Sequence, residues 1–517
     1  MSVSPHNFVY IDGELGPAKA VQEALAPRFS VVPGRRPRTV HRTWLDTFDW
    51  RLYRAGVTLE YVTGRGPGEL VLTGAAGERI TAAANGTRWP ARADDLPGGP
   101  LRDRLEGLTW IRALLPTAKA ASNVAEFRLT NTDDKTVAWL TVDHMLAAQP
   151  TTADLPARLS VTAVRGYQPQ ADRIARCLAI EPGVMLDGQP PLAAVLATAG
   201  LAPGEYSGKV EVALTPAMPA RMALAAVLLQ LLDTLEANVA GTVRDIDTEF
   251  LHDLRVSVRR TRTALKLGGD LLPGGLAGQY RPSFKWLGDL TTPTRDLDVQ
   301  LLTFDKGAAA LTSASPADLA PFHSYLLERR TLEQRRLARA LRSARFAALT
   351  SSWRSALTGL APPQRGPTAA RAAAAIIRRA HRRVLTLGGA ITDDSPPESL
   401  HDLRKRCKEL RYALEFFASL HDPAAHRDAV RELKGLQDCL GTFQDCQVQQ
   451  HEIRVIAADM MAARDVPATA LLAMGDLSAQ IGRRERRARS EFAGRFAEFA
   501  SRPAQARFRA LALDASA

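Results

Sequence analysis

Residues 250–267 read FLHDLRVSVRRTRTALKL, and residues 399–416 read SLHDLRKRCKELRYALEF. Both segments open with His-Asp-Leu-Arg and continue with Arg and Lys at helical spacing. A shift of 149 residues aligns 252–300 with 401–449 without a gap and gives 14 identities in 49 positions. The chain therefore contains two copies of one helical unit, and we expect them to pack about a pseudo-two-fold axis.

Helical periodicity continues through most of residues 206–517, which predicts an all-α domain. The expected helices cover 216–245, 249–268, 281–304, 317–360, 369–388, 398–421, 424–459 and 465–500. Residues 1–205 instead contain short segments rich in β-branched and aromatic residues, separated by Gly, Asp or Asn, which predicts strands. The expected strands cover 39–47, 57–64, 69–74, 125–131 and 136–145, and one expected helix covers 100–116 and ends at a proline.

The stretch LAPGEYSG at 201–208 is typical of a linker and separates the strand-rich pattern from the helical pattern. We expect an α+β multidomain chain with a β-rich domain at 1–203 and an all-α domain at 209–510. The repeat divides the all-α domain into a first half at about 209–360 and a second half at about 368–510.

Positive charge is concentrated in the helical part of the chain. Residues 206–517 carry a formal net charge of +11, whereas residues 1–205 carry +1. This asymmetry favours an anionic partner for the helical domain, and a solvated Arg-rich surface is the alternative. No apolar run reaches the roughly 18 residues of a membrane span, and the N-terminus lacks the pattern of a secretory signal. We therefore expect a cytoplasmic protein without a membrane segment; the sequence does not indicate an oligomeric state.

Each repeated segment forms a basic stripe when it is drawn as a helix. At about 100° per residue, His252, Arg255, Arg259, Arg262 and Lys266 fall within an arc of roughly 80°. This arc borders the apolar stripe instead of lying opposite to it, so we expect it to line a groove or pore between helices. The second copy repeats the design with His401, Lys405, Lys408 and Arg411. Stacked like charges destabilise a helix, and an extended polyanion would offset that cost.

Catalytic and metal-binding patterns are missing from the repeat. His252 and His401 have no carboxylate or His four residues later, and their cationic surroundings repel a metal ion. No Ser/His/Asp or Cys/His grouping stands out, and the four cysteines match no zinc pattern. We expect the histidines to donate to phosphate, with no metal, cofactor or catalysis. Asp253 and Asp402 are expected to cap the helices or to compensate the charge of the helix start, and Asp296, Asp298 and Asp445 to orient basic side chains.

The segments HDLRVSVRRTRTALK, HDLRKRCKELRYALEFF, LGDLTTPTRDLDV and LKGLQDCLGTFQD resemble the CHAD family, a helical domain named for its histidines. The resemblance covers about 206–510 and implies two pseudo-symmetric four-helix bundles around a basic pore or groove. It also implies binding of inorganic polyphosphate and, in some members, association with polyphosphate granules. By motif position the implied binding residues are His252, Arg255, Arg259, Arg262, Lys266, Lys285, His401, Arg404, Lys405, Lys408, Arg411 and Lys434.

Further cations on the predicted helices are weaker candidates, because an ordinary solvated face is the favoured explanation for them. They are Arg260, Arg335, Arg336, Arg339, Arg378, Arg379 and Arg382. The second copy also departs from the first, since Glu409 and Glu415 replace Arg260 and Lys266. We therefore expect the second half to bind a polyanion less strongly than the first.

The N-terminal segments HRTWLDTFDWRLYRAGVTLEY (41–61) and WLTVDHM (139–145) resemble the CYTH family, a β-barrel-like tunnel that hydrolyses triphosphates with divalent metal. That family opens with an alternating Glu-x-Glu-x-Lys strand, which places both carboxylates on one strand face to hold metal. At that position this chain has NFVYIDGEL (7–15), which contains no such pair, and it has Glu60 where a basic residue is expected. Glu126, Arg128 and Asp143 make up only part of the set of charged residues that the tunnel would need. We expect a degenerate CYTH-like domain without activity.

Two alternatives to polyphosphate binding remain open. One is a metal-dependent triphosphatase or polyphosphatase in the N-terminal domain, which the absent Glu pair disfavours. The other is nucleic-acid binding, which is disfavoured because Tyr412 is the only aromatic residue that could stack on bases within the two basic stretches.

Overall fold

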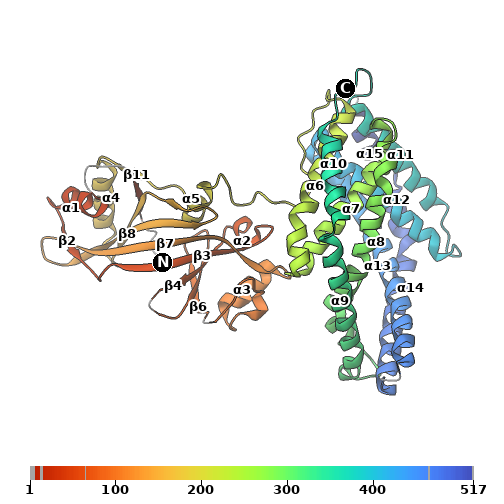
Figure 1. Ribbon diagram of the computed structural model, residues 1–517, viewed down its shortest axis with the longest axis horizontal. Helices are drawn as coiled ribbons and strands as arrows, with labels where there is room; N and C mark the ends of the chain where they lie inside the picture. Colours follow the sequence, from red (N-terminus) through yellow and green to blue (C-terminus); the bar gives the residue numbers. More distant parts are fainter. Residues whose placement is uncertain (1–5, 12–15, 65, 85, 464–465, 515–517) are drawn as a thin grey trace. The chain divides into compact units, whose positions relative to one another are not determined.

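The computed structural model describes residues 6–11, 16–64, 66–84, 86–463 and 466–514. The chain divides into two compact units, residues 1–207 and 208–517 (Figure 1). The end of the segment 7–15 and the expected helix start at 465 lie outside the described residues. A β-rich unit followed by an all-α unit is the predicted fold class, and it is confirmed.

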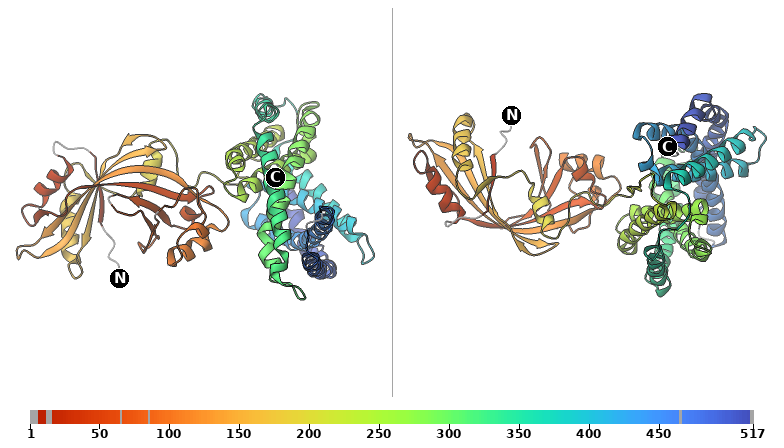
Figure 2. Two further views of the ribbon diagram at one scale, coloured as in Figure 1. Left: turned by 60° about the horizontal axis from the view of Figure 1, so that its bottom comes forward. Right: turned by 90° about the horizontal axis from the view of Figure 1, so that it is seen from above.

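The N-terminal unit is built on one antiparallel sheet. Its strands are β1 (His6–Tyr10), β2 (Ser30–Pro33), β3 (Arg38–Thr47), β4 (Thr58–Thr63), β5 (Glu69–Thr73), β6 (Arg79–Ala83), β7 (Leu114–Thr130), β8 (Thr136–Gln149), β9 (Ala153–Asp154), β10 (Ala157–Ala163) and β11 (Val184–Leu186). The main path runs β11-β1-β10-β8-β7-β3-β4-β5-β6, and the sheet is strongly curved in Figure 2. Within the described residues β11 and β6 are not paired with each other, so hydrogen bonds do not close the sheet into a tunnel.

Both faces of this sheet carry apolar residues, because successive side chains on a strand point to opposite sides. On β8, Leu140 and Val142 pack beneath α1 (Pro17–Leu25) and α4 (Gln168–Ala179). Met145 and Ala147 pack on the other side with α5 (Pro191–Ala197).

A third core in this unit lies around β4 and β5. It includes α2 (Arg51–Arg54) and α3 (Pro100–Thr109). The predicted helix 100–116 is too long, because α3 ends at Thr109 and Pro116 already belongs to strand β7. Proline is tolerated there at the start of the strand.

The helical unit consists of two runs of five α-helices within the described residues. The first run is α6 (Ala220–Arg244), α7 (Thr248–Gly268), α8 (Leu276–Ala308), α9 (Ala320–Leu341) and α10 (Ala344–Thr358). The second run is α11 (Ala369–Gly389), α12 (Pro397–Phe416), α13 (Pro423–Ala462), α14 (Ala468–Phe499) and α15 (Arg502–Asp514). The shift of 149 residues relates α6 to α11 and α7 to α12, and the same order continues to the end of each run.

An isolated β-bridge lies at the pseudo-two-fold axis between these runs. It joins Pro219 to Thr368, which are equivalent under the 149-residue shift. The amide of Ala220 donates to the carbonyl of Pro367 at 3.0 Å, and the equivalent amide of Ala369 donates to Met218 at 2.7 Å. Two exchanged hydrogen bonds between equivalent residues are what a local two-fold axis produces.

One continuous core holds the two halves together. It contains Leu254 and Leu265 of α7, Leu403 and Leu414 of α12, and Trp353 of α10. A second core lies between α8, α9, α13 and α14, which extend away from the rest of the unit (Figure 1). The halves are therefore two copies in sequence but share their apolar interior.

Several helix boundaries in the helical unit differ from the prediction, among them the end of α12, which lies at Phe416 and not at 421. The expected helix 317–360 is two helices, because α9 ends at Leu341 and the Ser343 hydroxyl caps α10 by accepting from the Phe346 amide at 3.3 Å. Helix α8 begins at Leu276 and continues through Pro282 and Pro293. Helix α15 lies beyond the last predicted helix.

Helix α6 is long and apolar enough to cross a membrane by length and composition alone. Its residues Val227, Leu228, Leu231 and Leu235 are fully or almost fully buried in the shared core. This is the environment of a core helix in a soluble protein.

Candidate functional site

The basic helices α7 and α12 start in different ways. Asp247 caps α7, since its carboxylate accepts from the amides of Glu249 at 2.9 Å and Phe250 at 3.3 Å. Asp253, which was expected to cap α7 or compensate its start, lies in the second turn of α7, so the capping alternative is wrong. Helix α12 starts at Pro397, and Asp402 pairs with Lys405 at 3.0 Å instead of capping the helix.

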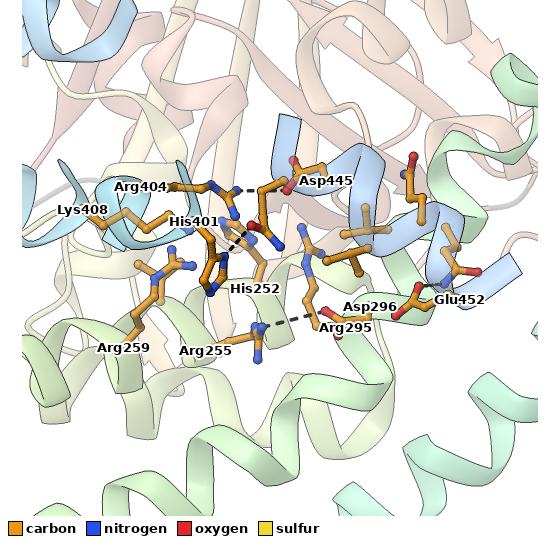
Figure 3. Close-up of a pocket in the computed structure, with 16 residues that line it drawn as sticks. His252, Arg255, Arg259, Arg295, Asp296, His401, Arg404, Lys408, Asp445 and Glu452 are labelled. Carbon is orange, nitrogen blue, oxygen red and sulfur yellow. Dashed lines mark hydrogen bonds and ion pairs between the residues drawn. The ribbon is translucent and has the colours of Figure 1, made fainter. Parts of the chain in front are cut away.

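A cavity of about 370 Å³ lies between α7, α8, α12 and α13 (Figure 3). Most of its lining consists of residue pairs that the 149-residue shift relates. The pairs are His252 and His401, Arg255 and Arg404, Arg259 and Lys408, Arg295 and Gln444, Asp296 and Asp445, Val299 and Val448, and Gln300 and Gln449. Val256 and Glu452 complete the lining. We call this the central cavity, because it is built from equivalent residues of both halves.

Carboxylates at equivalent positions hold two of its arginines. Arg255 lies 3.8 Å from Asp296, and Arg404 lies 3.0 Å from Asp445. These contacts confirm the predicted orienting role of both aspartates. Asp298, the third aspartate predicted to orient a basic side chain, accepts from Arg330 at 2.9 Å outside the cavity.

The remaining cations leave the central cavity with an excess of positive charge. Arg295 lies 3.7 Å from Glu249. The Arg259 guanidinium lies over the Tyr412 ring, 5.7 Å from its centroid, and its buried Nε has no hydrogen-bond partner. Lys408 has no hydrogen bond or ion pair within the described part of the chain. Donors without acceptors in a cavity are suited to an anion that brings its own oxygens.

Burial changes the pKa of several groups in the cavity, among them Asp296, whose pKa it raises. It lowers the pKa of Lys408 to about 7, and the positive charges of Arg259 and Arg404 lower it further while Asp445 opposes the effect. Burial also lowers the pKa of Arg255. The pKa of Glu452 is raised to about 6, by burial and then by the charge of Asp296.

A second hollow of about 600 Å³ adjoins the central cavity. The residues that line both are His252, Val256, Arg259, Arg404, Lys408 and Asp445. The second hollow adds Arg260, Arg411, Tyr412 and Glu415 among its lining residues. The shared residues mean that a long ligand could contact both.

Glu409 and Glu415, which differ from their repeat equivalents in the first half, form ion pairs between the halves. Arg260 lies 2.7 Å from Glu415, and Lys266 lies 2.5 Å from Glu409. Glu409 is the repeat equivalent of Arg260, and Glu415 is the equivalent of Lys266. A perfectly repeated sequence would therefore place like charges against each other across the pseudo-two-fold axis. The glutamates turn that repulsion into pairing.

Several predicted binding residues lie outside both cavities. Arg262, Lys266, Lys285, Lys405 and Lys434 line neither of them. Lys285 pairs with Asp289 at 2.6 Å on the surface, and Lys434 is exposed.

The weaker candidates are dispersed. Arg335 and Arg339 line a separate open hollow on α9. Arg336 pairs with Glu333 at 3.2 Å, and Arg379 donates to the Leu267 carbonyl at 2.8 Å. Arg378 and Arg382 are exposed on α11.

Apart from Asp296 and Asp445, the lining contributed by α8 and α13 was not predicted from the sequence. Val299, Gln300, Gln444, Gln449 and Glu452 all belong to these helices. Val299 and Gln300 are identical to Val448 and Gln449 in the repeat. That identity was a usable signal, since helix positions repeated so far from the motif mark a shared environment.

In the N-terminal unit, arginines form ion pairs with the acidic residues Glu60, Glu126 and Asp143. Arg42 on β3 lies 3.0 Å from Glu60 and 2.9 Å from Asp143, and it donates to the Ser122 hydroxyl at 3.0 Å. Arg38 pairs with Glu126 at 3.2 Å. Within the described residues no group of three or more His, Cys, Asp or Glu side chains is placed to hold a metal ion.

Comparison with known families identifies the helical unit. The family model described as CHAD domain matches residues 226–454, so this unit contains a CHAD domain. The crystal structure of the CHAD domain from the plant Ricinus communis is 25% identical over 58% of this chain and 98% of that one, with a TM-score of 0.49. PptA from Streptomyces chartreusis is 19% identical over 54% of this chain and 99% of that one, with a TM-score of 0.43.

Two further solved structures match a smaller share of this chain, both at low identity. A putative adenylate cyclase from Bacillus halodurans is 10% identical over 37% of this chain and 95% of that one, with a TM-score of 0.25. A putative adenylyl cyclase from Hippeastrum, described as having a dominant triphosphatase activity, is 13% identical over 39% of this chain and 99% of that one, with a TM-score of 0.27. No match is found among curated proteins.

Proposed function

We propose that the helical unit binds inorganic polyphosphate in the central cavity. One observation carries the proposal: equivalent cations and histidines from α7 and α12 converge on one cavity at the pseudo-two-fold axis. A linear polyphosphate reads the same in both directions, so it matches a site whose two sides are alike. The adjoining hollow offers Arg260 and Arg411 to a chain that extends beyond the cavity.

The arginines would contact phosphate oxygens by charge-assisted hydrogen bonds, which a guanidinium can make in pairs. His252 and His401 would donate as well, and more strongly when protonated. Polyphosphate has no bases, so the scarcity of aromatic residues in the lining does not weaken the proposal. A protein that binds in this way would associate with polyphosphate granules in the cytoplasm.

The test is binding of long-chain polyphosphate to the full chain over a salt series. If about four phosphate charges are neutralised, the affinity should fall about 50-fold between 50 and 200 mM salt. The double variant Arg259→Gln/Arg404→Gln removes two charge-assisted contacts and should bind about 100-fold more weakly. Arg431→Gln/Arg487→Gln, at two exposed arginines outside the cavity, is the matched control. Equal binding by all three proteins, or stronger binding of RNA, would reject the proposal.

We further propose that the N-terminal unit does not hydrolyse triphosphates, because Arg42 occupies the carboxylates that a metal would need. Release of phosphate from tripolyphosphate should therefore be absent with magnesium or manganese. Magnesium-dependent release that is lost in Asp143→Asn would contradict this and place an active site in the sheet.

A further inference from the structure

Lys408 occupies the position in the second half that Arg259 occupies in the first. For binding an anion the two residues are similar, but their chemistry differs. A guanidinium stays protonated under ordinary conditions, whereas a lysine amine can lose its proton and act as a nucleophile. The repeat has therefore placed one potentially reactive amine in a cavity that is also lined by four arginines.

The surroundings of Lys408 favour its neutral amine. Arg255, Arg259 and Arg404 each repel its positive charge, and Asp445 is the carboxylate that attracts it. Asp445 already accepts a hydrogen bond from Arg404 at 3.0 Å. Lys408 itself makes no hydrogen bond or ion pair within the described residues, so no carboxylate fixes the ammonium form. In agreement, the pKa of Lys408 is lowered to about 7, mainly by burial.

The same arginines that repel the ammonium can hold a phosphate beside the amine. Figure 3 shows Arg259, Arg404 and Lys408 extending toward the same part of the cavity. A small molecule with a phosphate at one end and a carbonyl group at the other would satisfy both features. The cavity of about 370 Å³ is large enough for such a compound.

We propose that the central cavity accepts small phosphorylated aldehydes covalently, through an imine between the Lys408 amine and the aldehyde carbon. The inference rests on the proposed anion binding by this cavity. The lone pair of Nζ adds to the carbonyl carbon, and the carbonyl oxygen takes up a proton to give a carbinolamine. Loss of that oxygen as water then forms the C=N bond. Both water hydrogens balance those lost by the amine, and nothing is oxidised or reduced.

A histidine is placed to assist the loss of water. His401 Nδ1 is hydrogen-bonded to Gln444 Oε1, an atom that can only accept, so Nδ1 carries a proton. Nε2 is then available to exchange a proton with a group in the cavity. His252, at the equivalent position, lines the same space.

The test uses pyridoxal 5′-phosphate as the probe and the full chain. At neutral pH the imine should appear as a visible absorption band, and borohydride reduction should fix one label per chain at Lys408 in peptide mass analysis. Pyridoxal without the phosphate should label about tenfold more weakly, because it lacks the charge-assisted contacts. Lys408→Arg restores the residue of the first half and should fold normally without the label. Lys306→Arg, at an exposed lysine of α8, is the control that should label fully.

Labelling spread over many lysines, or equal labelling by pyridoxal with and without phosphate, would overturn the inference. Prior addition of long-chain polyphosphate should protect Lys408. If polyphosphate binds but Lys408 stays unlabelled, this inference fails and the proposed function stands. If Lys408 is labelled but polyphosphate neither binds nor protects it, the reactive lysine is supported and the proposed function fails.

Discussion

Arg259 and Lys408 give the central cavity one permanent charge and one that depends on pH. Free Lys408 titrates at a pKa of about 7, although an ordinary lysine titrates near 10.5. A bound polyanion stabilises the ammonium form and raises this pKa again. Binding therefore takes up a proton whenever the solution pH lies between the pKa values of the free and the bound lysine.

We expect the affinity for polyphosphate to fall as the pH rises from about 7 to 9. Below pH 7 free Lys408 already carries its charge, and above it protonation opposes binding by up to about tenfold per pH unit. Lys408→Arg should flatten the profile, because a guanidinium stays charged. Calorimetry in two buffers of different ionisation enthalpy measures the proton uptake. A flat profile for the unaltered protein would contradict the expectation.

At the scale of the element, α7 and α12 meet as charge complements. Glu415 accepts from Arg260 at 2.7 Å on the opposite helix and from Arg411 at 2.8 Å on its own. The side chains of Arg260 and Glu415 are only 12% and 17% exposed. Such a pair is costly to break from one side, because the remaining charge is left without a partner.

We expect Glu415→Gln to lower the free energy of unfolding by about 2 kcal/mol, as it leaves Arg260 partly buried without its carboxylate. Glu491→Gln removes a surface pair with Arg487 and should cost no more than about 0.5 kcal/mol. Urea unfolding followed by circular dichroism compares the two variants. Equal stability of both would mean that the pair between the halves contributes little.

These elements also show what sequence could and could not predict. The repeat predicted α7 and α12, their basic stripes and a pseudo-two-fold axis, because helical periodicity and residue identity between the copies can be read directly from the sequence. It predicted Arg255, Arg259 and Lys408 on the basic stripes, and the family resemblance added Arg404; the structure brings these four together. It could not give the pairing of Arg260 with Glu415, because an alignment relates equivalent residues and not those in contact. Glu415 was therefore interpreted as a loss of binding strength.

At the scale of the whole molecule, the helical unit uses its duplication to make one fold. The shared core includes residues of both halves, and the bridge between Pro219 and Thr368 joins them at the axis. The N-terminal unit has separate cores of its own. Duplication thus gives the central cavity two similar sides. The replacement of two basic residues by Glu409 and Glu415 in the second copy removes the repulsion that identical copies would have at their contact.

This arrangement leads to a prediction about the halves themselves. We expect residues 208–517 to unfold cooperatively on their own, whereas residues 208–361 or 362–517 alone should not. Each half alone would expose its share of the common core, including Leu254 and Leu265 in the first. The first half also cannot bury this surface by forming a symmetric homodimer, because Arg260 of one copy would then face Lys266 of the other.

Mixing the two halves should restore a one-to-one complex, since only the unlike halves place glutamates opposite the basic residues. Size-exclusion chromatography and thermal circular dichroism measure this directly. The mixture should melt cooperatively and recover polyphosphate binding, because the central cavity needs α7 from one half and α12 from the other. A cooperative transition in either half by itself would show that the shared core is dispensable, and the two copies would then be independent bundles joined by a linker.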